Sequence, residues 1–489
     1  MYLGIDLGTS SVKVLMMATD GTIIDEVTQE YPVYYPHTNW AEQQPEDWWK
    51  GTMDALVLLA ERNPETKKQI KALSFSGQMH GMVALDKSGD VLTPAIIWCD
   101  QRTGEECEAL TAHFTPKGLS DLVGNKALTG FTAPKILWLK KNHPDIFNRI
   151  DKILLPKDYI NYKLSGEFAT DYSDASGMLL LDVANKCYSA PILAYIGIRE
   201  DQLPKLYESY DVTGSVKREI LDILGIPGDV LITSGAGDQA AGAIGTGTVS
   251  EGVISVTLGT SGVVFAAHDQ YKVDAENRLH AFCHANGKYH SMGVMLSAAN
   301  SLKWWSDQIA MGDIEPLLNE VDERITEVQF LPYLMGERTP YADPDARGTF
   351  IGMDMNSHRK DLTKALLEGV AFGLKDSLDI LSDIGVPTEE IRVIGGGAKS
   401  IKWRQILADV FGHRIVGINT NQGGALGAAI LAAVGDGAYG SVEEATQRII
   451  KTEDAVEPDI EKHRHYQKKH AHFKALYGHL KQYFKEVQA

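Results

Sequence analysis

The sequence predicts an α/β protein built from two similar domains, and three observations lead to this expectation. The 489 residues exceed the length at which a single hydrophobic core usually keeps growing. The peptide LGTSSV at residues 7–12 returns as LGTSGV at residues 258–263, and each copy lies between runs of β-branched and aliphatic residues. Strand-like runs, glycine turns and helical patterns follow one another along much of the chain. We therefore expect one domain over residues 1–247 and a second over residues 248–489.

Both copies of the repeated peptide are predicted to be hairpin loops between two strands. Strand-like runs lie at residues 1–6 and 12–17 around the first copy, and at residues 253–257 and 263–267 around the second. Without bulky side chains such a loop can bring backbone N–H groups close to an anion, and Thr and Ser hydroxyls add further donors. Gly, Thr and Ser also form good turns for purely structural reasons. The duplication favours the first interpretation, in which two loops clamp one polyphosphate.

Charge and composition narrow the classes of partner and compartment. The formal net charge of −18, from 47 Lys and Arg against 65 Asp and Glu, repels nucleic acid and anionic membrane surfaces. The four cysteines form no C-x-x-C pair, as expected for reduced thiols in the cytosol. The N-terminus shows no signal-peptide pattern, and the longest near-apolar stretch, residues 423–434, is too short to span a bilayer. We expect a soluble cytoplasmic protein without nucleic-acid or membrane partners, and a homodimer is compatible with the sequence.

In the first half, the predicted elements bring two polar segments to the ends of strands. A strand over residues 70–75 leads into a turn at residues 76–81 and then into a second strand. Residues 104–210 read mainly as helices and loops, punctuated by prolines. A buried-type strand at residues 230–234 then runs through Gly-Ala-Gly to Asp238 and a small-residue helix. Polar groups of the turn are therefore expected at a sheet edge, and Asp238 at a helix N-terminus.

The second half contains a strand, a glycine loop and a helix in direct succession. The strand is predicted at residues 391–394, the loop GGGA at residues 395–398 and the helix at residues 401–411. A purine or ribose could lie on the backbone of this loop, although it falls short of the G-x-G-x-x-G fingerprint and a plain turn is the alternative. No G-x-x-x-x-G-K-[ST] loop occurs in the sequence. Residues 457–489 are predicted to form a terminal helix with an apolar stripe and five histidines on a solvated face.

Two aspartates are the candidates for chemistry. Asp6 ends the first strand directly before the first loop, where a carboxylate can hold a hydrated Mg²⁺ against phosphates. The alternative for Asp6 is a turn-forming residue that bonds the next amides. Asp238 follows small residues that leave its carboxylate accessible, so it can act as a general base. The other role for Asp238 is a helix N-cap, and the two roles can coexist.

These segments together resemble the FGGY family of carbohydrate kinases, within the actin-like and Hsp70-like ATPase superfamily. The segments that carry the resemblance are the first phosphate motif at residues 6–10, the first FGGY signature at 131–138, the second phosphate motif at 255–261, the segment GERTP at 336–340 and the adenosine motif at 395–398. The resemblance implies two actin-like (ribonuclease H-like) ATPase domains with a nucleotide and sugar cleft between them. It also implies an ATP-dependent sugar kinase that uses Mg²⁺.

Within this family, residues 77–81 (GQMHG) and 98–102 (WCDQR) are most similar to the members that phosphorylate D-xylulose at its terminal hydroxyl. By that likeness Asp238 would be the general base and Asp6 would organise Mg²⁺. The residues that would contact the sugar are Met79, His80, Asp238 and Gln239, and those that would contact ATP are Thr9, Ser10, Lys13, Gly259, Thr260, Gly396 and Gly397. Cys99 stands where these members carry Asn or a similar polar residue.

Two rival functions stay open from the sequence. A kinase for ribulose, gluconate or another polyol would differ from a D-xylulose kinase in only a few pocket residues. The turn at residues 77–81 offers a neutral ketose one apolar contact, from Met79, and one imidazole donor, from His80. A sugar acid would instead call for a cation, which this turn does not supply. The remoter rival is an actin-like or Hsp70-like ATPase without a sugar substrate, against which the sugar-kinase signature stands.

Overall fold

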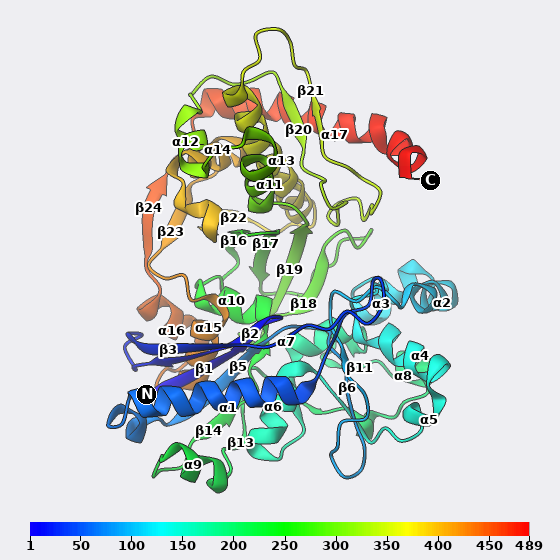
Figure 1. The fold of residues 1–489 in the computed structure, drawn as a ribbon, viewed down its shortest axis with the longest axis vertical. Helices are drawn as coiled ribbons and strands as arrows, with labels where there is room; N and C mark the ends of the chain where they lie inside the picture. The colour runs from blue at the N-terminus through cyan, green and yellow to red at the C-terminus, as the bar shows by residue number, and fades with distance from the viewer. Residues whose placement is uncertain (489) are drawn as a thin grey trace.

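The computed structural model describes residues 1–488, and the chain forms two lobes, each built around a seven-stranded sheet (Figure 1). The N-terminal sheet has the strand order β13-β14-β5-β1-β2-β3, and β15 also pairs with β5. Its strands are β1 (Tyr2–Leu7), β2 (Ser11–Met17), β3 (Ile23–Glu30), β5 (Ala72–Gly77), β13 (Val212–Ser215), β14 (Leu231–Thr233) and β15 (Ala236–Gly237). Strands β1 and β5 are parallel, so their carboxyl ends meet at one edge of the sheet.

The C-terminal sheet repeats this arrangement in the order β18-β19-β17-β16-β22-β23-β24. Its strands are β16 (Gly252–Leu258), β17 (Gly262–His268), β18 (His280–Cys283), β19 (Tyr289–Met295), β22 (Thr388–Ile394), β23 (Ile415–Ile418) and β24 (Thr452–Val456). The series β3-β2-β1-β5-β14 and β19-β17-β16-β22-β23 both consist of two antiparallel pairs followed by two parallel pairs. This duplicated topology confirms the predicted α/β fold of two similar domains. The boundary near Gly247 stays a prediction.

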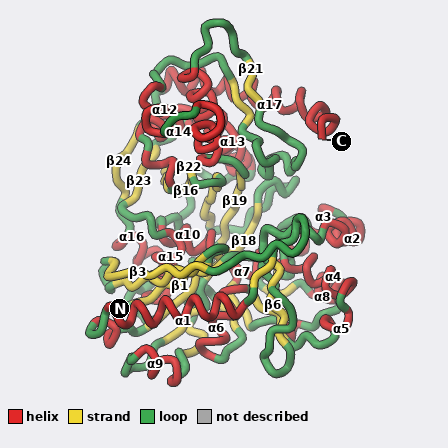
Figure 2. The backbone as a smooth tube through the Cα atoms, viewed as in Figure 1, coloured by secondary structure: helices red, strands yellow, loops and turns green. Residues whose placement is uncertain are grey.

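Helices cover the sheets and build the outer part of each lobe (Figure 2). In the first half they are α1 (Pro45–Arg62), α2 (Gly104–Phe114), α3 (Pro116–Val123), α4 (Thr132–Asn142), α5 (Pro144–Phe147), α6 (Pro156–Ser165), α7 (Tyr172–Ala175), α8 (Ala190–Ile196), α9 (Arg218–Leu224) and α10 (Asp238–Gly245). In the second half they are α11 (Ala299–Trp304), α12 (Ile314–Glu320), α13 (Arg359–Asp383), α14 (Ile401–Phe411), α15 (Gly423–Gly435), α16 (Val442–Ile449) and α17 (Ile460–Gln488). Proline opens several of them, because its fixed φ suits the first helical turn and its missing N–H needs no partner there.

Two-stranded ribbons complete the fold. They pair β4 (Glu42–Gln43) with β7 (Ala95–Ile96), β6 (Val83–Leu85) with β8 (Lys152–Leu154), β9 (Ala169–Asp171) with β12 (Lys205–Tyr207), β10 (Leu181–Asp182) with β11 (Cys187–Tyr188), and β20 (Gln329–Leu331) with β21 (Thr349–Ile351). Strands β8 to β12 of these ribbons lie within residues 104–210, the stretch that the sequence predicts to be mainly helices and loops. The prediction is right for the helices α2 to α8 and misses the short strands among them.

Helix α15 belongs to the second half of the chain but packs on the N-terminal sheet. Alternate side chains of β1 point to opposite faces, so Leu3 packs with α1 and Tyr2 packs with α15. A Cβ on Gly4 would lie 1.8 Å from the carbonyl oxygen of Ala425 in α15, so only glycine fits there. The glycine and alanine run at residues 423–434 therefore forms a close-packed surface between the two halves of the chain.

The terminal helix α17 packs against α13 and α14 through the predicted apolar stripe. The buried members of the stripe are Tyr466, Phe473, Tyr477 and Phe484. His470 is one turn beyond Tyr466 on the same face, and its Nε2 lies 2.8 Å from the Asp376 carboxylate. The expectation that all five histidines lie on a solvated face is therefore wrong for His470. Helical periodicity places it on the buried side of α17.

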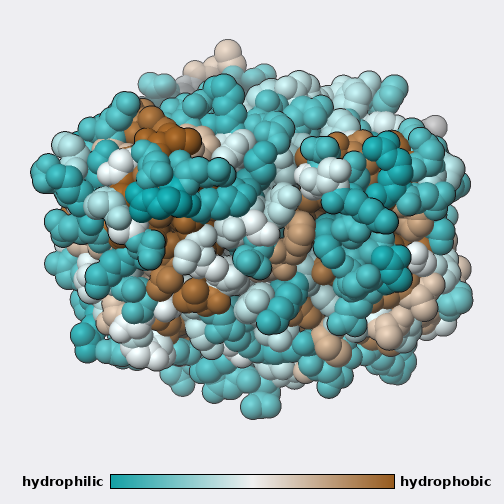
Figure 3. Space-filling model, turned by 90° about the horizontal axis from the view of Figure 1, so that it is seen from below, coloured by the Kyte–Doolittle hydropathy of each residue, from teal (hydrophilic) through white to brown (hydrophobic). Residues whose placement is uncertain are grey.

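The lower face of the molecule is mainly polar. Figure 3 looks at the lower end of the molecule in Figure 1 and shows hydrophilic residues over most of this face, with apolar residues in separate areas. Within residues 1–488, no helix combines the length and the apolar character needed to cross a membrane.

Candidate active site

The first predicted phosphate loop, residues 8–10, is held in shape by hydrogen bonds. The Gly8 amide donates to the carbonyl of Ser11 at 2.9 Å, and the Tyr31 hydroxyl donates to the carbonyl of Gly8 at 2.6 Å. The Trp98 indole N–H donates to the Thr9 hydroxyl at 2.9 Å. Segment 98–102 therefore helps to fix this loop, while Ser10 stays exposed.

Asp6 is the second-last residue of β1 and lies beside this loop, and its two carboxylate oxygens have different surroundings. Oδ1 accepts a hydrogen bond of 2.6 Å from the Ser76 hydroxyl in the neighbouring strand β5. Gly424 at the start of α15 closes the same side, because a Cβ there would lie 2.5 Å from the Ser76 hydroxyl and 2.9 Å from Oδ1. Burial raises the pKa of Asp6, although the Ser76 hydrogen bond and the charge of Lys13 oppose this effect. Oδ2, which receives no hydrogen bond from residues 1–488, is left for a ligand.

Asp238 lies at the same edge of the sheet, because β15 pairs with β5 directly before it. Gly237 occupies the N-cap position of α10, and Asp238 is the first helical residue. Burial and, after it, the negative charge of Asp6 raise the pKa of Asp238 to about 7, against the effect of a hydrogen bond from the Gln239 amide. A carboxyl group with this pKa can accept and release a proton near neutral pH, which is what a general base requires.

Met79 and His80 lie in the turn that follows β5. Met79 is buried and packs against Gly237, where a Cβ would lie 2.9 Å from the Met79 Cγ. His80 has a φ of 71°, and its Nδ1 lies 2.7 Å from the carbonyl oxygen of Gly177. The turn is therefore in contact with the backbone that carries Asp238, on one side, and with the short 3-10 helix Ser176–Met178 that follows α7, on the other.

The hydrogen bond of His80 decides what its ring can offer a ligand. Burial lowers the pKa of His80 to about 3, so the ring is neutral at physiological pH. A carbonyl oxygen can only accept, so Nδ1 carries the single ring proton and Nε2 is an acceptor. The predicted role of His80 as a donor is therefore reversed, because the carbonyl of Gly177 takes its only N–H.

Helix α4, which carries most of the signature at residues 131–138, supports the turn. The Thr132 hydroxyl and the Lys135 ammonium donate to the backbone carbonyl of His80 at 3.0 and 2.9 Å. Lys135 is fully buried, also donates to the carbonyl of Gly130 at 2.6 Å, and has its pKa lowered by burial to about 7. This support was not predicted, because Lys135 lies 55 residues beyond His80 in the sequence.

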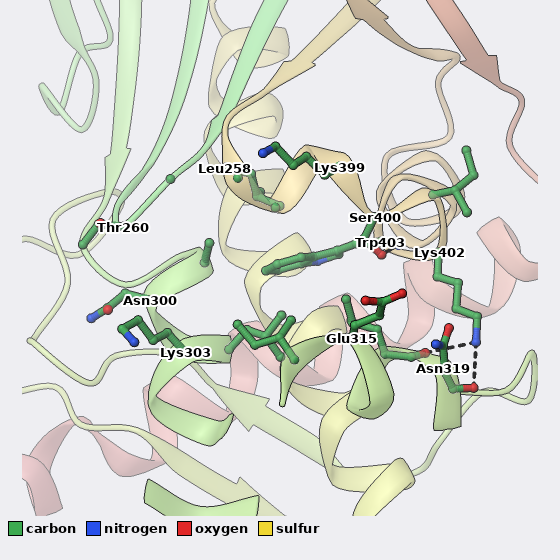
Figure 4. A pocket seen from close by; sticks show the side chains of 18 residues that line it. Leu258, Thr260, Asn300, Lys303, Glu315, Asn319, Lys399, Ser400, Lys402 and Trp403 are labelled. Atoms are coloured by element: carbon green, nitrogen blue, oxygen red, sulfur yellow. Dashed lines mark hydrogen bonds between the residues drawn. The ribbon is translucent and has the colours of Figure 1, made fainter. Parts of the chain in front are cut away.

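A cavity of about 900 Å³ in the C-terminal lobe contains Gly259, Thr260, Gly396 and Gly397, four of the positions predicted to contact ATP (Figure 4). Strands β16 and β22 pair in parallel, so the loops that follow them meet at one edge of the sheet. Figure 4 shows the Trp403 indole beside Leu258 in the wall of the cavity, with Thr260 and Asn300 at one end and Asn319 and Lys402 at the other. The Lys402 ammonium donates to the carbonyls of Leu318, Asn319 and Val321, which ties α14 to the end of α12.

The glycines of the loop at residues 395–398 allow its close approach to β16. Gly395 has a φ of 93°, and a Cβ there would lie 2.7 Å from the Leu258 carbonyl oxygen. A Cβ on Gly397 would lie 2.4 Å from the Leu258 side chain, whereas the space beside Gly396 is open. A mostly apolar cavity of this size with exposed backbone at one edge suits a flat heterocycle such as a purine.

The predicted site residues thus fall into two groups. Those at the edge of the N-terminal sheet are Asp6, Thr9, Ser10, Lys13, Met79, His80, Asp238 and Gln239, and those in the C-terminal cavity are Gly259, Thr260, Gly396 and Gly397. Lys13 donates to the Gln422 side chain at 3.0 Å, so its ammonium is held by the segment that leads into α15.

Gln78 connects the first phosphate loop to the turn, a role that was not predicted. Its amide nitrogen donates to the carbonyl of Gly8 at 3.2 Å and to the Gln43 side chain at 2.8 Å. The Gln43 amide in turn donates to the carbonyl of Thr9 at 2.7 Å. The loop and the turn are therefore one hydrogen-bonded unit.

A duplicated sheet of this topology, with a hairpin loop after the first strand of each copy and aspartates at the strand ends, defines a two-lobed ATPase of the actin-like type. The comparisons with known proteins narrow this class. Residues 1–245 match the N-terminal domain of the FGGY family of carbohydrate kinases, and residues 254–435 match its C-terminal domain. The chain therefore belongs to the FGGY family of carbohydrate kinases, and it is an enzyme.

Individual relatives cover nearly the whole chain. It is 40% identical to the xylulose kinase of Escherichia coli (strain K12) over 472 residues, which is 96% of both chains. The crystal structure of a xyloylose kinase from Brucella ovis has a TM-score of 0.93 at 38% identity and covers 98% of this chain and 99% of that one. The crystal structure of gluconate kinase from Lactobacillus acidophilus has the same TM-score of 0.93 at 25% identity and covers 99% of both chains. ATP and a small carbohydrate are thus the substrates that the family implies.

Proposed function

We propose that this enzyme transfers the terminal phosphoryl group of ATP to the terminal hydroxyl of D-xylulose, which gives ADP and D-xylulose 5-phosphate. The observation that carries the proposal is the setting of Asp238, whose pKa is raised to about 7 at a sheet edge shared with Asp6 and the turn of Met79 and His80. The similarity to the xylulose kinases of Escherichia coli and Brucella ovis supports the choice of acceptor.

Each group of residues has one task in this reaction. Asp238 accepts the proton of the acceptor hydroxyl. At the same time the hydroxyl oxygen bonds to the γ-phosphorus of ATP, and the bond between that phosphorus and the bridging oxygen breaks, which releases ADP. Met79 gives the sugar an apolar contact, and Nε2 of His80 accepts a hydrogen bond from a sugar hydroxyl, which orients the acceptor. The loops at residues 8–10 and 259–261 supply backbone and hydroxyl donors to the phosphates.

Asp6 is the residue that would hold Mg²⁺. Its Oδ2 has no donor within residues 1–488, and carboxylate oxygen is a ligand that this ion prefers. The Ser76 hydroxyl fixes Oδ1 and thereby the orientation of the carboxylate. A Mg²⁺ ion supplies charge neutralisation for the transferring phosphoryl group. With Mg²⁺ bound, the negative charge of Asp6 would be partly neutralised, so Asp6 would raise the pKa of Asp238 less than it does without the ion.

A sugar acid is the second candidate acceptor, because a cation from another segment, Arg338, acts electrostatically on His80 of the turn. Arg338, in the segment GERTP, belongs to no ion pair of the described chain. After burial, its positive charge is among the causes that lower the pKa values of His80 and His280. A carboxylate on the acceptor could pair with this guanidinium. The similarity to the gluconate kinase of Lactobacillus acidophilus agrees with this alternative.

A coupled assay of ADP release tests the choice between the acceptors. The panel contains D-xylulose, D-ribulose, gluconate and glycerol at fixed MgATP, and the product is identified by mass and by phosphorus NMR. We expect the highest kcat/KM with D-xylulose and D-xylulose 5-phosphate as the product. A higher kcat/KM with gluconate that is lost in Arg338→Gln would establish the second candidate. ADP release that no sugar stimulates would contradict both.

A further inference from the structure

Near Asp238 lies a buried group of one lysine and three aspartates that the proposed reaction does not use. The Lys157 ammonium is 2.7 Å from Asp158, 3.0 Å from Asp171 and 3.7 Å from Asp174, and none of the four side chains is exposed to solvent. Burial opposes the charge of Lys157, but the three carboxylates outweigh burial and raise its pKa. The ammonium therefore stays charged and holds the carboxylates in place.

Asp171 connects this buried group to Ser173 through hydrogen bonds. Its Oδ2 accepts hydrogen bonds from the Ser173 amide at 2.8 Å, from the Ser173 hydroxyl at 2.5 Å and from the Ser209 hydroxyl at 2.7 Å. The Ser173 oxygen in turn accepts a hydrogen bond of 3.2 Å from the Gly237 amide. A hydroxyl has one hydrogen, and in Ser173 it is donated to Asp171, so a lone pair faces Gly237.

The same group of residues lies against both parts of the acceptor site. Gly237 directly precedes Asp238, and a Cβ on Gly237 would lie 2.9 Å from the Met79 side chain. A Cβ on Gly77, at the end of β5, would lie 2.7 Å from the Cβ of Lys157. The two glycines thus let the turn, the strand end and the lysine pack without space between them.

We propose that Ser173 is a positioning residue for phosphoryl transfer. Held by Asp171, its hydroxyl fixes the Gly237 amide and so the backbone from which Asp238 reaches the acceptor hydroxyl. The inference rests on the proposed role of Asp238 as the general base. Without the Ser173 hydroxyl, the buried Gly237 amide loses its acceptor, and the backbone must move to find another. A displacement of about 1 Å at a reacting group can lower a rate by about 10²-fold.

The chain offers a matched control for this role. Ser209 donates to the same oxygen of Asp171 as Ser173 does and is also buried, but within residues 1–488 its hydroxyl makes no hydrogen bond to the backbone next to Asp238. The carbonyl of Ser209 accepts a hydrogen bond of 2.9 Å from the Gly235 amide, and Ser209→Ala keeps this backbone bond. Ser209→Ala therefore removes an equivalent hydroxyl from Asp171 without freeing the Gly237 amide. Comparing Ser173→Ala with Ser209→Ala separates positioning of Asp238 from general support of the buried group.

The experiment measures kcat, KM for ATP and KM for D-xylulose in both variants, together with their thermal midpoints. We expect Ser173→Ala to lower kcat by about 10- to 100-fold with the KM for ATP within about twofold of the wild type. Ser209→Ala should keep kcat within about threefold while the two midpoints fall by similar amounts. Should Ser173→Ala not fold, Asp171→Asn is the second variant, and it should lower kcat in the same way.

Two results would overturn the inference. One is a wild-type kcat in folded Ser173→Ala, or in Asp171→Asn if only that variant folds. The other is an equal loss of kcat in Ser173→Ala and Ser209→Ala. Asp238→Asn, measured in parallel, keeps this failure distinct from that of the proposed function. If Asp238→Asn is inactive while Ser173→Ala has the wild-type kcat, the role of Asp238 as the base is supported and only the positioning role of Ser173 is contradicted.

Discussion

The reactivity proposed for Asp238 depends on how its neighbours set its pKa. Burial and the negative charge of Asp6 raise this pKa to about 7 in the ion-free site, and Mg²⁺ held by Asp6 would lower it from that value. Only the ionised carboxylate can accept a proton, so the base is present above the pKa and is lost below it. We expect kcat/KM for D-xylulose to fall about tenfold per pH unit on the acid side and to level off above the pKa. The measurement is a pH profile at saturating MgATP, and a rate that does not change between about pH 5 and 8 would be incompatible with this base.

Asp6 should control the response to magnesium. Asp6→Ala removes the carboxylate whose Oδ2 would hold the ion but leaves Ser76 and Lys13 in place. We expect the Mg²⁺ concentration for half-maximal activity to rise by about tenfold or more and kcat to fall. A titration of activity against Mg²⁺ at fixed ATP measures both effects. An unchanged titration curve would make Asp6 a structural turn residue.

For single residues, the sequence predicts which residue types form the site better than it predicts their protonation and hydrogen bonding. Asp6 and Asp238 could be predicted as candidates because a strand end, a glycine turn and a helix start are local patterns. The tautomer of His80 could not be predicted, because the carbonyl that takes its proton belongs to Gly177, 97 residues later. Ser173 gave no local signal either, since its two partners, Asp171 and Gly237, come together only through the fold.

Among the elements, α4 has a function that can be tested apart from the reacting groups. Lys135→Met keeps the length of the side chain but removes the donor to the His80 and Gly130 carbonyls. We expect kcat/KM for D-xylulose to fall by about 10- to 100-fold, because the turn that orients the acceptor loosens, while the KM for ATP changes little.

Lys140→Met on the same helix is the control. Its ammonium also donates to a carbonyl, that of Ile196, but on the outer side of α4 and away from the turn. Steady-state kinetics of the two variants should show the loss in Lys135→Met alone. Equal kinetics in both would show that α4 does not determine the geometry of the turn.

The elements show where periodicity is a reliable guide. Helix α14 has the predicted bounds, residues 401–411, because a glycine loop precedes it and Gly412 ends it in a left-handed conformation. Strand β5 extends into the predicted turn, since its pairing with β1 continues to Gly77. Periodicity also gives the stripe of α17, but not the carboxylate on α13 that meets His470.

For the whole molecule, the two groups of site residues imply closure around the substrates. Asp6 and Asp238 lie in one lobe and the cavity with Gly259 and Gly396 lies in the other, so MgATP and sugar would be bound by both. We expect the radius of gyration in small-angle scattering to decrease when D-xylulose and a non-hydrolysable ATP analogue are added together. Each ligand alone serves as the control. No decrease beyond error with both ligands would contradict closure and leave the kinase chemistry untouched.

The duplicated fold could be predicted from a repeated hexapeptide, because strand, loop and strand recur in the same order in both halves. The packing of α15 on the first sheet could not. Its contacts join residues such as Lys13 and Gln422, which are 409 positions apart, and the glycine and alanine run looks alike whether it packs on its own sheet or on another. Contacts at such separation depend on the folded chain as a whole.

The most direct test of the proposed function is the turnover of Asp238→Asn with D-xylulose and MgATP, measured alongside its affinity for ATP. Asparagine has the shape of aspartate but does not accept the hydroxyl proton, so we expect kcat to fall by about 10²- to 10⁴-fold. The dissociation constant for ATP should stay within about twofold of the wild type, because the predicted ATP contacts lie elsewhere. A folded Asp238→Asn protein that forms D-xylulose 5-phosphate at nearly the wild-type rate would contradict the proposed mechanism.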